Sequence, residues 1–506
     1  QDKITNEKQI RGGEFLIFWR CFTMKKILFV SSEAVPYIKT GGLADVVGSL
    51  PKYFNRKEYD VRVILPKYAC MDAAFLPGLH FVCHFYVNLN WRKQYAGIFE
   101  AEYKGVRYYF VDNEFYFAGP SPYNNIYEDV EKFAYFSKAV LEALPYIDFA
   151  PDVIHCHDWQ TGLVPVYLHT AFGADNFYAG IKTVFSIHNF KFQGRWRIRE
   201  VIDITGLPEQ IFNDRELESY GEANYLKGGV VYSDAVTTVS PSYANEIMTQ
   251  EGGEGLDGLM RARKNSLYGI LNGIDYDEFN PETDPYIEAN FTSKNVMSVK
   301  KKDKAALQKE LGLPVREDAF VIGVVSRMTE QKGFDLISYI LDDMVTKLDV
   351  QLVILGTGEN KYENAFHHFH SQYPDKVSAY IGYSEARAHK IYASADAFLM
   401  PSLFEPCGLS QMMSMRYGTI PIVRETGGLK DTVEAYNEYE NSGTGFSFCN
   451  FNADEMFHII EYAYHVFSDD KRAWENLMQR AMKQDFSWNN SARQYEKLYD
   501  SLCEMK

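Results

Sequence analysis

Short apolar runs recur along this chain, and each is followed by a polar turn and then by a segment with helical spacing. The runs of the first half lie at residues 27–30, 61–65, 108–111, 153–155, 183–187 and 235–239, and those of the second half at 321–325, 351–355, 377–380, 397–400 and 420–423. Apolar runs of this length are typical of buried parallel strands. Their alternation with helices predicts an α/β fold of doubly wound, Rossmann-like sheets, in which ligands bind beyond the carboxyl ends of the strands.

The length of 506 residues predicts more than one domain. We expect a first Rossmann-like domain over residues 24–275, a second over 276–488, and a hinge near residues 274–281. The segment 489–506 has apolar residues at helical spacing that need a partner surface, so we expect a helix that crosses back to the first domain.

Residues 1–23 differ from the rest of the chain. A polar stretch is followed by an apolar burst at residues 14–19, which is too short to span a bilayer. The order of a signal peptide is missing as well. We expect this leader to lie outside the fold, which then begins at Met24.

Composition and charge exclude some classes of partner. The net charge of −16 argues against a general nucleic-acid binder and against a protein that binds anionic membranes. Seven cysteines without regular spacing are typical of reduced thiols, so we expect a cytoplasmic protein. The charge run at residues 294–304 is interpreted as the solvated start of a helix. The oligomeric state stays open.

A loop with the sequence Lys39-Thr40-Gly41-Gly42 joins the first apolar run to a helix that is expected from about Leu43. Glycines let backbone N–H groups approach a ligand, and a helix N-terminus favours negative charge, so the loop suits an anion. A tight turn with a solvated lysine has the same pattern. A second Thr-Gly-Gly-Leu loop, at residues 426–429, also follows an apolar run. Two such loops in opposite halves predict two domains that face one cleft.

Two further segments suit a diphosphate. Arg327 and Lys332 follow the run 321–325, and cations five residues apart can converge on one phosphate group, although an ordinary surface pair looks the same. Pro406 fits the first turn of a helix, which would leave the N–H groups of residues 407–410 free for an anion.

The spacing of Asp275 and Asp277 resembles a cation-binding D-x-D motif. These residues lie in a turn-rich connector, and the chain already supplies cations for a phosphate. The sequence also lacks a Cys/His cluster with zinc spacing. We therefore expect neither a metal nor a cofactor.

Eight segments, in order, carry a resemblance to a known family. They are KTGGLADV (39–46), HCHDWQTGLVP (155–165), SIHNFKFQG (186–194), YLKGGVVYSDAVTTVSPSYANEI (225–247), GILNGIDYDEFNPETD (269–284), SRMTEQKGFD (326–335), PSLFEPCGLSQM (401–412) and RETGGLKDTV (424–433). The chain from Met24 onward resembles the bacterial glycogen synthases and plant starch synthases, which are retaining glucosyltransferases of the GT-B fold.

The resemblance implies roles for individual residues. Glu405 would contact the donor glucose, His188 its 6-hydroxyl side, and Asp158 the acceptor side of the cleft, while Arg327 and Lys332 would bind phosphate. Taken alone, a strand-end histidine such as His188 is more often a structural hydrogen-bonder, and Asp158 is equally typical of a helix N-cap. The remaining contacts to substrate would come from Lys39, Gly41, Gly42, Asn189, Tyr383 (on the adenine), Cys407, Gly408, Leu409, Ser410, Thr426, Gly427 and Gly428. A buried core tyrosine is the alternative for Tyr383.

The function that follows is transfer of glucose from ADP-glucose, or possibly UDP-glucose, to the non-reducing end of an α-1,4-glucan. No carboxylate stands out as a nucleophile, so a front-face mechanism is favoured, in which the departing phosphate oxygen accepts the acceptor proton. Three alternatives remain open: another GT-B transferase, a GT-B sugar-nucleotide epimerase, and a silent glucan-binding regulatory protein. The last would be indicated by the loss of Lys39, His188, Arg327, Lys332 or Glu405, all of which are present.

Overall fold

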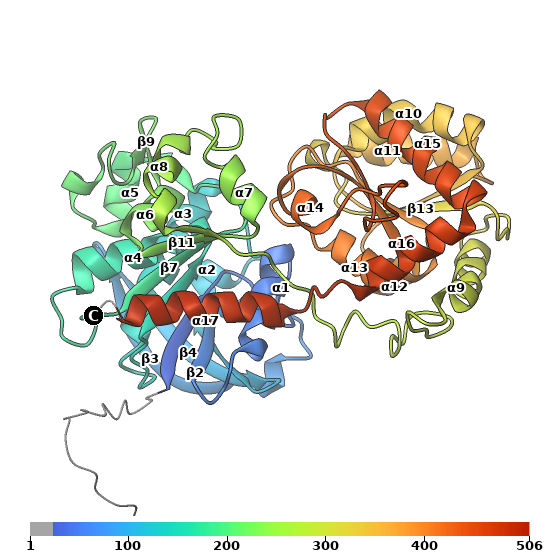
Figure 1. The fold of residues 1–506 in the computed structure, drawn as a ribbon. Helices are drawn as coiled ribbons and strands as arrows, with labels where there is room; N and C mark the ends of the chain where they lie inside the picture. Colours follow the sequence, from blue (N-terminus) through green and yellow to red (C-terminus); the bar gives the residue numbers. More distant parts are fainter. Residues whose placement is uncertain (1–23, 505–506) are drawn as a thin grey trace, which may run out of the picture.

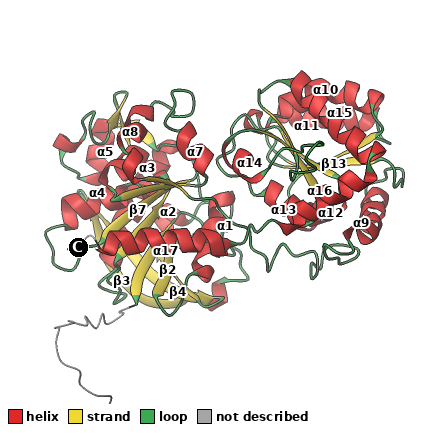
Figure 2. Cartoon of the chain, viewed as in Figure 1, coloured by secondary structure: helices red, strands yellow, loops and turns green. Residues whose placement is uncertain are grey.

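The computed structural model describes residues 24–504, so the expectation for residues 1–23 lies outside the described part. Two α/β domains lie side by side, each built on its own sheet with helices on its faces (Figures 1 and 2). The predicted α/β fold with two doubly wound, mainly parallel sheets is confirmed.

Within the described residues the first domain has a nine-stranded sheet in the order β12-β11-β7-β6-β1-β2-β5-β4-β3. Its strands are β1 (Lys25–Val30), β2 (Tyr59–Pro66), β3 (His80–Leu89), β4 (Arg92–Tyr103), β5 (Val106–Asp112), β6 (Val153–His157), β7 (Lys182–Ile187), β11 (Ala235–Thr238) and β12 (Leu267–Gly269). The strand β1 pairs in parallel with both β2 and β6, and it is buried from Ile27 to Val30. The loops that leave β1, β6 and β7 therefore emerge together at one edge of the sheet.

Helices and a small second sheet complete the first domain. The helices are α1 (Gly42–Ser49), α2 (Glu114–Phe117), α3 (Ile126–Ala143), α4 (Leu163–Tyr167), α5 (Ile198–Thr205), α6 (Tyr225–Tyr232), α7 (Pro241–Glu246) and α8 (Asp257–Ala262). The small sheet has the order β8-β10-β9, with β8 (Arg195–Arg197), β9 (Glu218–Ser219) and β10 (Glu222–Asn224).

The sequence did not predict the antiparallel hairpin of β3 and β4. Both strands alternate exposed and buried positions over much of their length, and exposed aromatics such as Phe81, Tyr86 and Trp91 lie on β3 and its turn. Because a half-exposed strand has no continuous apolar run, a search for such runs passes over it.

The second domain has a wholly parallel sheet in the order β15-β14-β13-β16-β17-β18. Its strands are β13 (Phe320–Val325), β14 (Val350–Gly356), β15 (Val377–Ile381), β16 (Ala397–Met400), β17 (Ile420–Arg424) and β18 (Phe446–Phe448). Its helices are α9 (Val296–Glu310), α10 (Phe334–Lys347), α11 (Asn360–Gln372), α12 (Glu385–Ser394), α13 (Ser410–Arg416), α14 (Gly427–Thr432), α15 (Ala453–Asp469) and α16 (Lys471–Lys483). The loop with Arg327 and Lys332 follows the strand β13 directly.

The last helix, α17 (Trp488–Glu504), lies along the first domain, as the red helix of Figure 1 shows. The hydroxyl of Tyr499 is 2.7 Å from Nδ1 of the buried His155, which lies on β6. Where the chain passes between the domains, the N–H of Ile274 donates to the carbonyl oxygen of Phe486 at 2.8 Å. The outgoing and returning segments are thus hydrogen-bonded to each other at the crossing.

The interpretation of residues 294–304 as the solvated start of a helix is right for only part of the run, since α9 begins at Val296 and Lys294, Lys301 and Lys302 are exposed. Lys300 and Lys304, on α9, are buried. Nζ of Lys300 donates to the carbonyl oxygens of Tyr392, Ala393 and Tyr417 and to Oγ1 of Thr419, at 2.6–3.2 Å. Burial lowers the pKa of Lys300 to about 7. The amine of Lys300 thus binds carbonyl oxygens near the end of α12 and beside Thr419, a role that depends on distant segments.

None of the helices within residues 24–504 combines the length and the apolar character that a membrane span requires.

Candidate active site

The first glycine loop connects β1 to α1 and is held by a carboxylate of its own domain. The buried Glu33 accepts hydrogen bonds from the backbone N–H and the hydroxyl of Thr40, the latter at 2.9 Å. Nζ of Lys39 donates to Oδ1 of Asp45 at 2.7 Å. Burial would lower the pKa of Lys39, but the Asp45 carboxylate outweighs it and raises that pKa above its ordinary value. Lys39 therefore stays positively charged beside the start of α1.

Asp158 and His188 meet where β6 and β7 end. Oδ1 of Asp158 accepts a hydrogen bond from the backbone N–H of His188 at 2.7 Å, and Nε2 of His188 lies 3.0 Å from Nδ1 of His157. The helix N-cap alternative for Asp158 is wrong, because its side chain caps none of the N–H groups of the following turn, Trp159–Thr161. Its φ of +57° is a left-handed value that is costly for a residue other than glycine.

The pKa values of this pair move in opposite directions from a common cause. Burial raises the pKa of Asp158 to about 7 and lowers the pKa of His188 to about 3. Both shifts follow from the cost of a charge in a poorly hydrated place. At neutral pH the imidazole of His188 is uncharged, and Asp158 lies near the midpoint of its titration.

In the second domain Lys332 contacts Glu405 directly. Nζ of Lys332 lies 2.5 Å from Oε2 of Glu405, and the hydroxyl of Ser402 donates to the same oxygen at 3.0 Å. Glu405 is buried, whereas Arg327 from the same loop as Lys332 is exposed. Within residues 24–504 the guanidinium of Arg327 has neither a hydrogen bond nor an ion pair, so it is available to a ligand.

The segment after Glu405 differs from its prediction. Helix α13 begins at Ser410, so Pro406 lies in the preceding loop and not in the first helical turn. The reason is Gly408, whose φ of +68° is left-handed and cannot belong to an α-helix. No acceptor for the backbone N–H groups of residues 407–410 is found among the described residues. The anion cradle expected here is thus a loop of free amides.

The second glycine loop, between β17 and α14, is packed closely. A Cβ atom at Gly427, whose φ is +45°, would lie 2.0 Å from the carbonyl oxygen of Glu405, and one at Gly428 would lie 2.1 Å from that of Cys407. The N–H of Gly427 donates to Oε1 of Glu246 at 2.7 Å, and the hydroxyl of Thr426 is 3.4 Å from the same carboxylate. Since Glu246 is on α7, this loop binds an anion that belongs to the first domain.

Other contacts also join the two domains around the candidate site. The hydroxyl of Ser240 donates to the carbonyl oxygen of Pro406 at 2.6 Å, and the hydroxyl of Ser242 donates to Asp431 at 2.6 Å. Nζ of Lys191 lies 5.8 Å from the ring centre of Phe404, which brings the segment after His188 to the loop of Glu405. The structure thus places the loops of both domains against one another.

Tyr383 lies between β15 and α12 and is 74% exposed, so the alternative of a buried core tyrosine is wrong. Its hydroxyl feels the charge of Lys39 from the opposite domain, which opposes the rise that burial produces in its pKa. An exposed ring at the mouth between the domains is accessible to a planar ligand. Asn189 is half-buried, and its Oδ1 accepts from the N–H of Lys191 at 3.1 Å.

Asp275 is engaged by the first domain. Its carboxylate lies 3.2 Å from Nζ of Lys52 and 3.5 Å from the hydroxyl of Tyr53, and it also accepts the N–H of Asp277 at 2.9 Å. The ammonium group of Lys52 therefore already pairs with the first aspartate of the D-x-D segment.

Sequence reasoning missed the carboxylates that hold both glycine loops. Glu33 and Glu246 each lie inside or beside a segment that was recognised, yet neither was singled out. A signal existed for Glu33, which is six residues before Lys39 at the end of an apolar strand. For Glu246 no local signal exists, because its partner is 181 residues away.

Comparisons with known proteins agree over almost the whole chain. The family model described as "Starch synthase catalytic domain" matches residues 26–262, and "Glycosyl transferases group 1" matches residues 308–477. The chain is 60% identical to a glycogen synthase of Lachnospira eligens over 479 residues, which are 95% of this chain and 100% of that protein.

Among solved structures, the catalytic domain of starch synthase IV from Arabidopsis thaliana, bound to ADP and acarbose, superposes with a TM-score of 0.87 at 33% identity. The superposition covers 95% of this chain and 100% of the starch synthase IV chain. A sucrose-phosphate synthase from Thermosynechococcus elongatus superposes with a TM-score of 0.62 at 16% identity over 95% of this chain and 100% of its own, a likeness of fold alone.

Proposed function

This chain belongs to the glycogen and starch synthase family of GT-B glucosyltransferases, and we propose that it transfers glucose from ADP-glucose to the non-reducing end of an α-1,4-glucan with retention of configuration. That the related starch synthase IV was solved with ADP supports ADP-glucose over UDP-glucose as donor. We place the reaction in the cytoplasm, as the pattern of cysteines suggests.

The observation that carries the donor site is the contact of Lys332 with Glu405 beside a loop of unpartnered amides. The leaving group of a nucleotide sugar is a diphosphate, which gains negative charge as the bond to the sugar breaks. Lys332 and the free guanidinium of Arg327 would face that charge, and the N–H groups of residues 407–410 would cradle it. Lys39 would add a third cation from the opposite domain. Glu405, held by Lys332 and Ser402, would orient the glucose.

His188 and Asp158 would position the sugar from the first domain. An imidazole that is neutral at pH 7 offers one nitrogen as a donor and one as an acceptor, which suits a hydroxyl of glucose. Asp158 fixes the backbone at His188 through its hydrogen bond to the N–H group and would lie towards the acceptor. Tyr383 and Asn189 would contact the adenine and the sugar.

The chemical step would proceed on one face of the sugar. The bond between the anomeric carbon and the diphosphate oxygen breaks, and the acceptor 4-hydroxyl oxygen forms the new bond on the same side. Its proton passes to the departing phosphate oxygen, so that a protonated nucleoside diphosphate leaves. Fixed cations around the diphosphate lower the barrier to this step.

The two domains would trap donor and acceptor between them. We propose that residues 24–275 form the acceptor side, residues 276–488 bind the nucleotide sugar, and residues 489–506 return to the first domain. The hinge would lie at residues 274–281, where the two crossing segments are hydrogen-bonded. Closure would exclude water, which would otherwise hydrolyse the donor.

The test is to incubate the protein with ADP-glucose or UDP-glucose, with and without glycogen, and to measure the nucleoside diphosphate and the lengthened glucan. We expect rapid release of ADP only when glycogen is present. If UDP is released from UDP-glucose but no ADP is released from ADP-glucose, the choice of nucleotide is overturned. Turnover of the nucleotide sugar without glucan would overturn the transferase in favour of an epimerase or hydrolase.

A further inference from the structure

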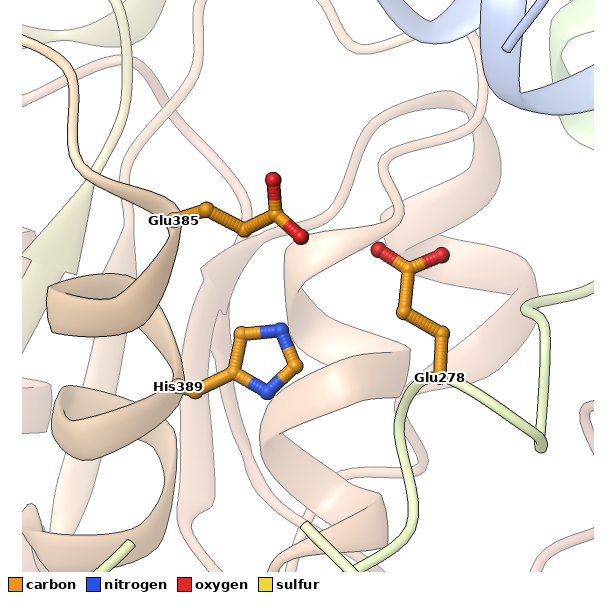
Figure 3. A group of neighbouring side chains, drawn as sticks. All are labelled: Glu278, Glu385 and His389. Atoms are coloured by element: carbon orange, nitrogen blue, oxygen red, sulfur yellow. The ribbon is translucent and has the colours of Figure 1, made fainter. Parts of the chain in front are cut away.

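A histidine and two glutamates meet between the domain connector and α12, beside Lys39 and Tyr383 of the candidate active site. Glu385 and His389 are four residues apart on one face of α12, and Glu278 projects from the connector (Figure 3). One ligand atom from each of the three lies within 4.8 Å of the other two. Both glutamates are exposed, whereas His389 is 1% exposed.

In the imidazole of His389, Nδ1 is hydrogen-bonded, whereas Nε2 has no hydrogen-bond partner among the described residues. Nδ1 lies 2.7 Å from Oδ2 of Asp284, which also accepts a hydrogen bond from Tyr417. Nε2 is buried and has no hydrogen-bond partner among residues 24–504. In Figure 3 the ring nitrogen without that partner points towards the two glutamate carboxylates. The ring of Phe279 stacks on the imidazole at 4.8 Å and fixes its plane.

This arrangement is the one that a metal-binding histidine requires. When a carboxylate accepts the Nδ1–H proton, the neutral tautomer presents its Nε2 lone pair as a ligand. A buried nitrogen without a partner otherwise costs free energy, so its orientation towards two carboxylates needs a partner between them.

We propose that Glu278, Glu385 and His389 bind a first-row divalent cation, Zn²⁺ being the best fit. One imidazole and two carboxylates are common ligands of Zn²⁺, with distances of about 2.0–2.2 Å. Ligands of one such ion lie roughly 3–4 Å apart, so the two exposed glutamates close on it by small side-chain rotations. The imidazole favours Zn²⁺ over Mg²⁺, which prefers oxygen ligands and keeps its waters.

The position gives the ion a structural consequence. Glu278 lies in the proposed hinge, whereas Glu385 and His389 belong to a helix of the second domain, so a bound ion fastens the connector to that domain. The site is separate from the phosphate cradle, and Asp277 of the D-x-D motif is not a ligand. Sequence spacing did not reveal it, because Glu278 is 107 residues before Glu385 (385 − 278).

The test uses the full-length protein after dialysis against EDTA, titrated with Zn²⁺ in competition with a chromophoric chelator. We expect one tight Zn²⁺ per chain and a rise in Tm on binding. Glu278→Gln and Glu385→Gln should each weaken Zn²⁺ binding by about 10- to 100-fold or more, since loss of even an outer partner of a metal ligand costs that much. Without metal both variants should melt with the parent, because both side chains are exposed.

The matched control is His465→Gln. His465 and Asp469 are also four residues apart on a helix, with Nδ1 3.3 Å from Oδ2, but they are exposed and lie outside any three-residue group of the described chain that could hold a metal. This variant should keep the tight site. Equal Zn²⁺ affinity in the parent and both glutamate variants would overturn the proposal. So would loss of tight binding in His465→Gln, or Mg²⁺ binding as strong as that of Zn²⁺.

Discussion

The two Thr-Gly-Gly-Leu loops share four residues of sequence but differ in what surrounds their glycines. At the first loop a Cβ atom on Gly41 would meet nothing within 4 Å, and one on Gly42 would come only within 3.8 Å of Leu409. At the second loop Gly427 and Gly428 pack against the backbone of Glu405 and Cys407, where a Cβ would come within 2.1 Å. The first loop faces open space, and the second supports another loop.

The carboxylates that hold the loops also differ in origin. Glu33 comes from the same β1–α1 connection as the loop it binds, whereas Glu246 reaches the second loop from the other domain. The same short motif thus borders open space beside Lys39 in one domain and makes a contact between domains in the other. A glycine motif therefore indicates that another group can come close to the backbone, but it does not indicate whether that group is a ligand or another part of the protein.

The largest effect should come from the cations of the second domain. If Lys332 and Arg327 face the leaving group as proposed, Lys332→Ala or Arg327→Ala should lower kcat by about 10²- to 10³-fold. Steady-state release of ADP measures this. An activity within threefold of the parent would show that the second domain does not hold the diphosphate.

Alanine at one glycine of each loop tests the comparison directly. Gly428→Ala forces the Cys407 carbonyl to move, so we expect a loss of about 1–3 kcal/mol in stability from overpacking, with kcat lowered roughly tenfold or more through displacement of the Glu405 loop. The control is Gly41→Ala, which has space for its methyl group and should keep the Tm of the parent. If both variants melt alike, the two loops do not differ as the structure indicates.

The contact between domains should respond to Glu246→Gln. A neutral amide loses the charge-assisted hydrogen bonds from Gly427 and Thr426, so the closed form should be less populated. We expect the donor KM to rise by up to about tenfold. Small-angle scattering should show a larger radius of gyration that contracts with ADP and a maltooligosaccharide. A radius unchanged by saturating ligand in an active protein would argue against the hinge at residues 274–281.

The smallest effect concerns the titration of Asp158. Its pKa is about 7 in the folded protein and near 3.8 for an ordinary Asp, so between these values the folded state holds a proton that the unfolded state has released. Its contribution to stability therefore falls as pH rises from about 4 to about 7. The lowered pKa of His188 acts in the opposite sense between about 3 and 6.5.

A comparison with Asp158→Asn isolates the first of these two effects. The variant retains His188 but cannot titrate at position 158, so its Tm should improve relative to the parent between pH 5 and pH 8. Thermal unfolding at several pH values measures the difference. Parallel curves for the two proteins would mean that the carboxyl of Asp158 is not desolvated.

Much of the fold could be predicted because its signals are local. An apolar run such as residues 321–325 is buried on both faces of a parallel sheet, so its composition alone identifies it as β13. Arg327, Lys332 and the glycine loops follow such runs directly, and their place at the strand ends follows from the topology of the sheet. The family resemblance added the roles that remain predictions.

Only the tertiary structure decided what reaches these elements from afar. The sequence around Lys300 predicts an exposed side chain. It is buried because carbonyl oxygens of residues 92 to 117 positions away accept hydrogen bonds from its amine. Pro406 lies outside α13 because Gly408 takes a left-handed conformation in a loop packed on Gly427 and Gly428. Glu246 and the group of Glu278, Glu385 and His389 depend on chain segments that meet only after folding. Periodicity records the environment of neighbouring residues, and it carries no information about partners a hundred residues away.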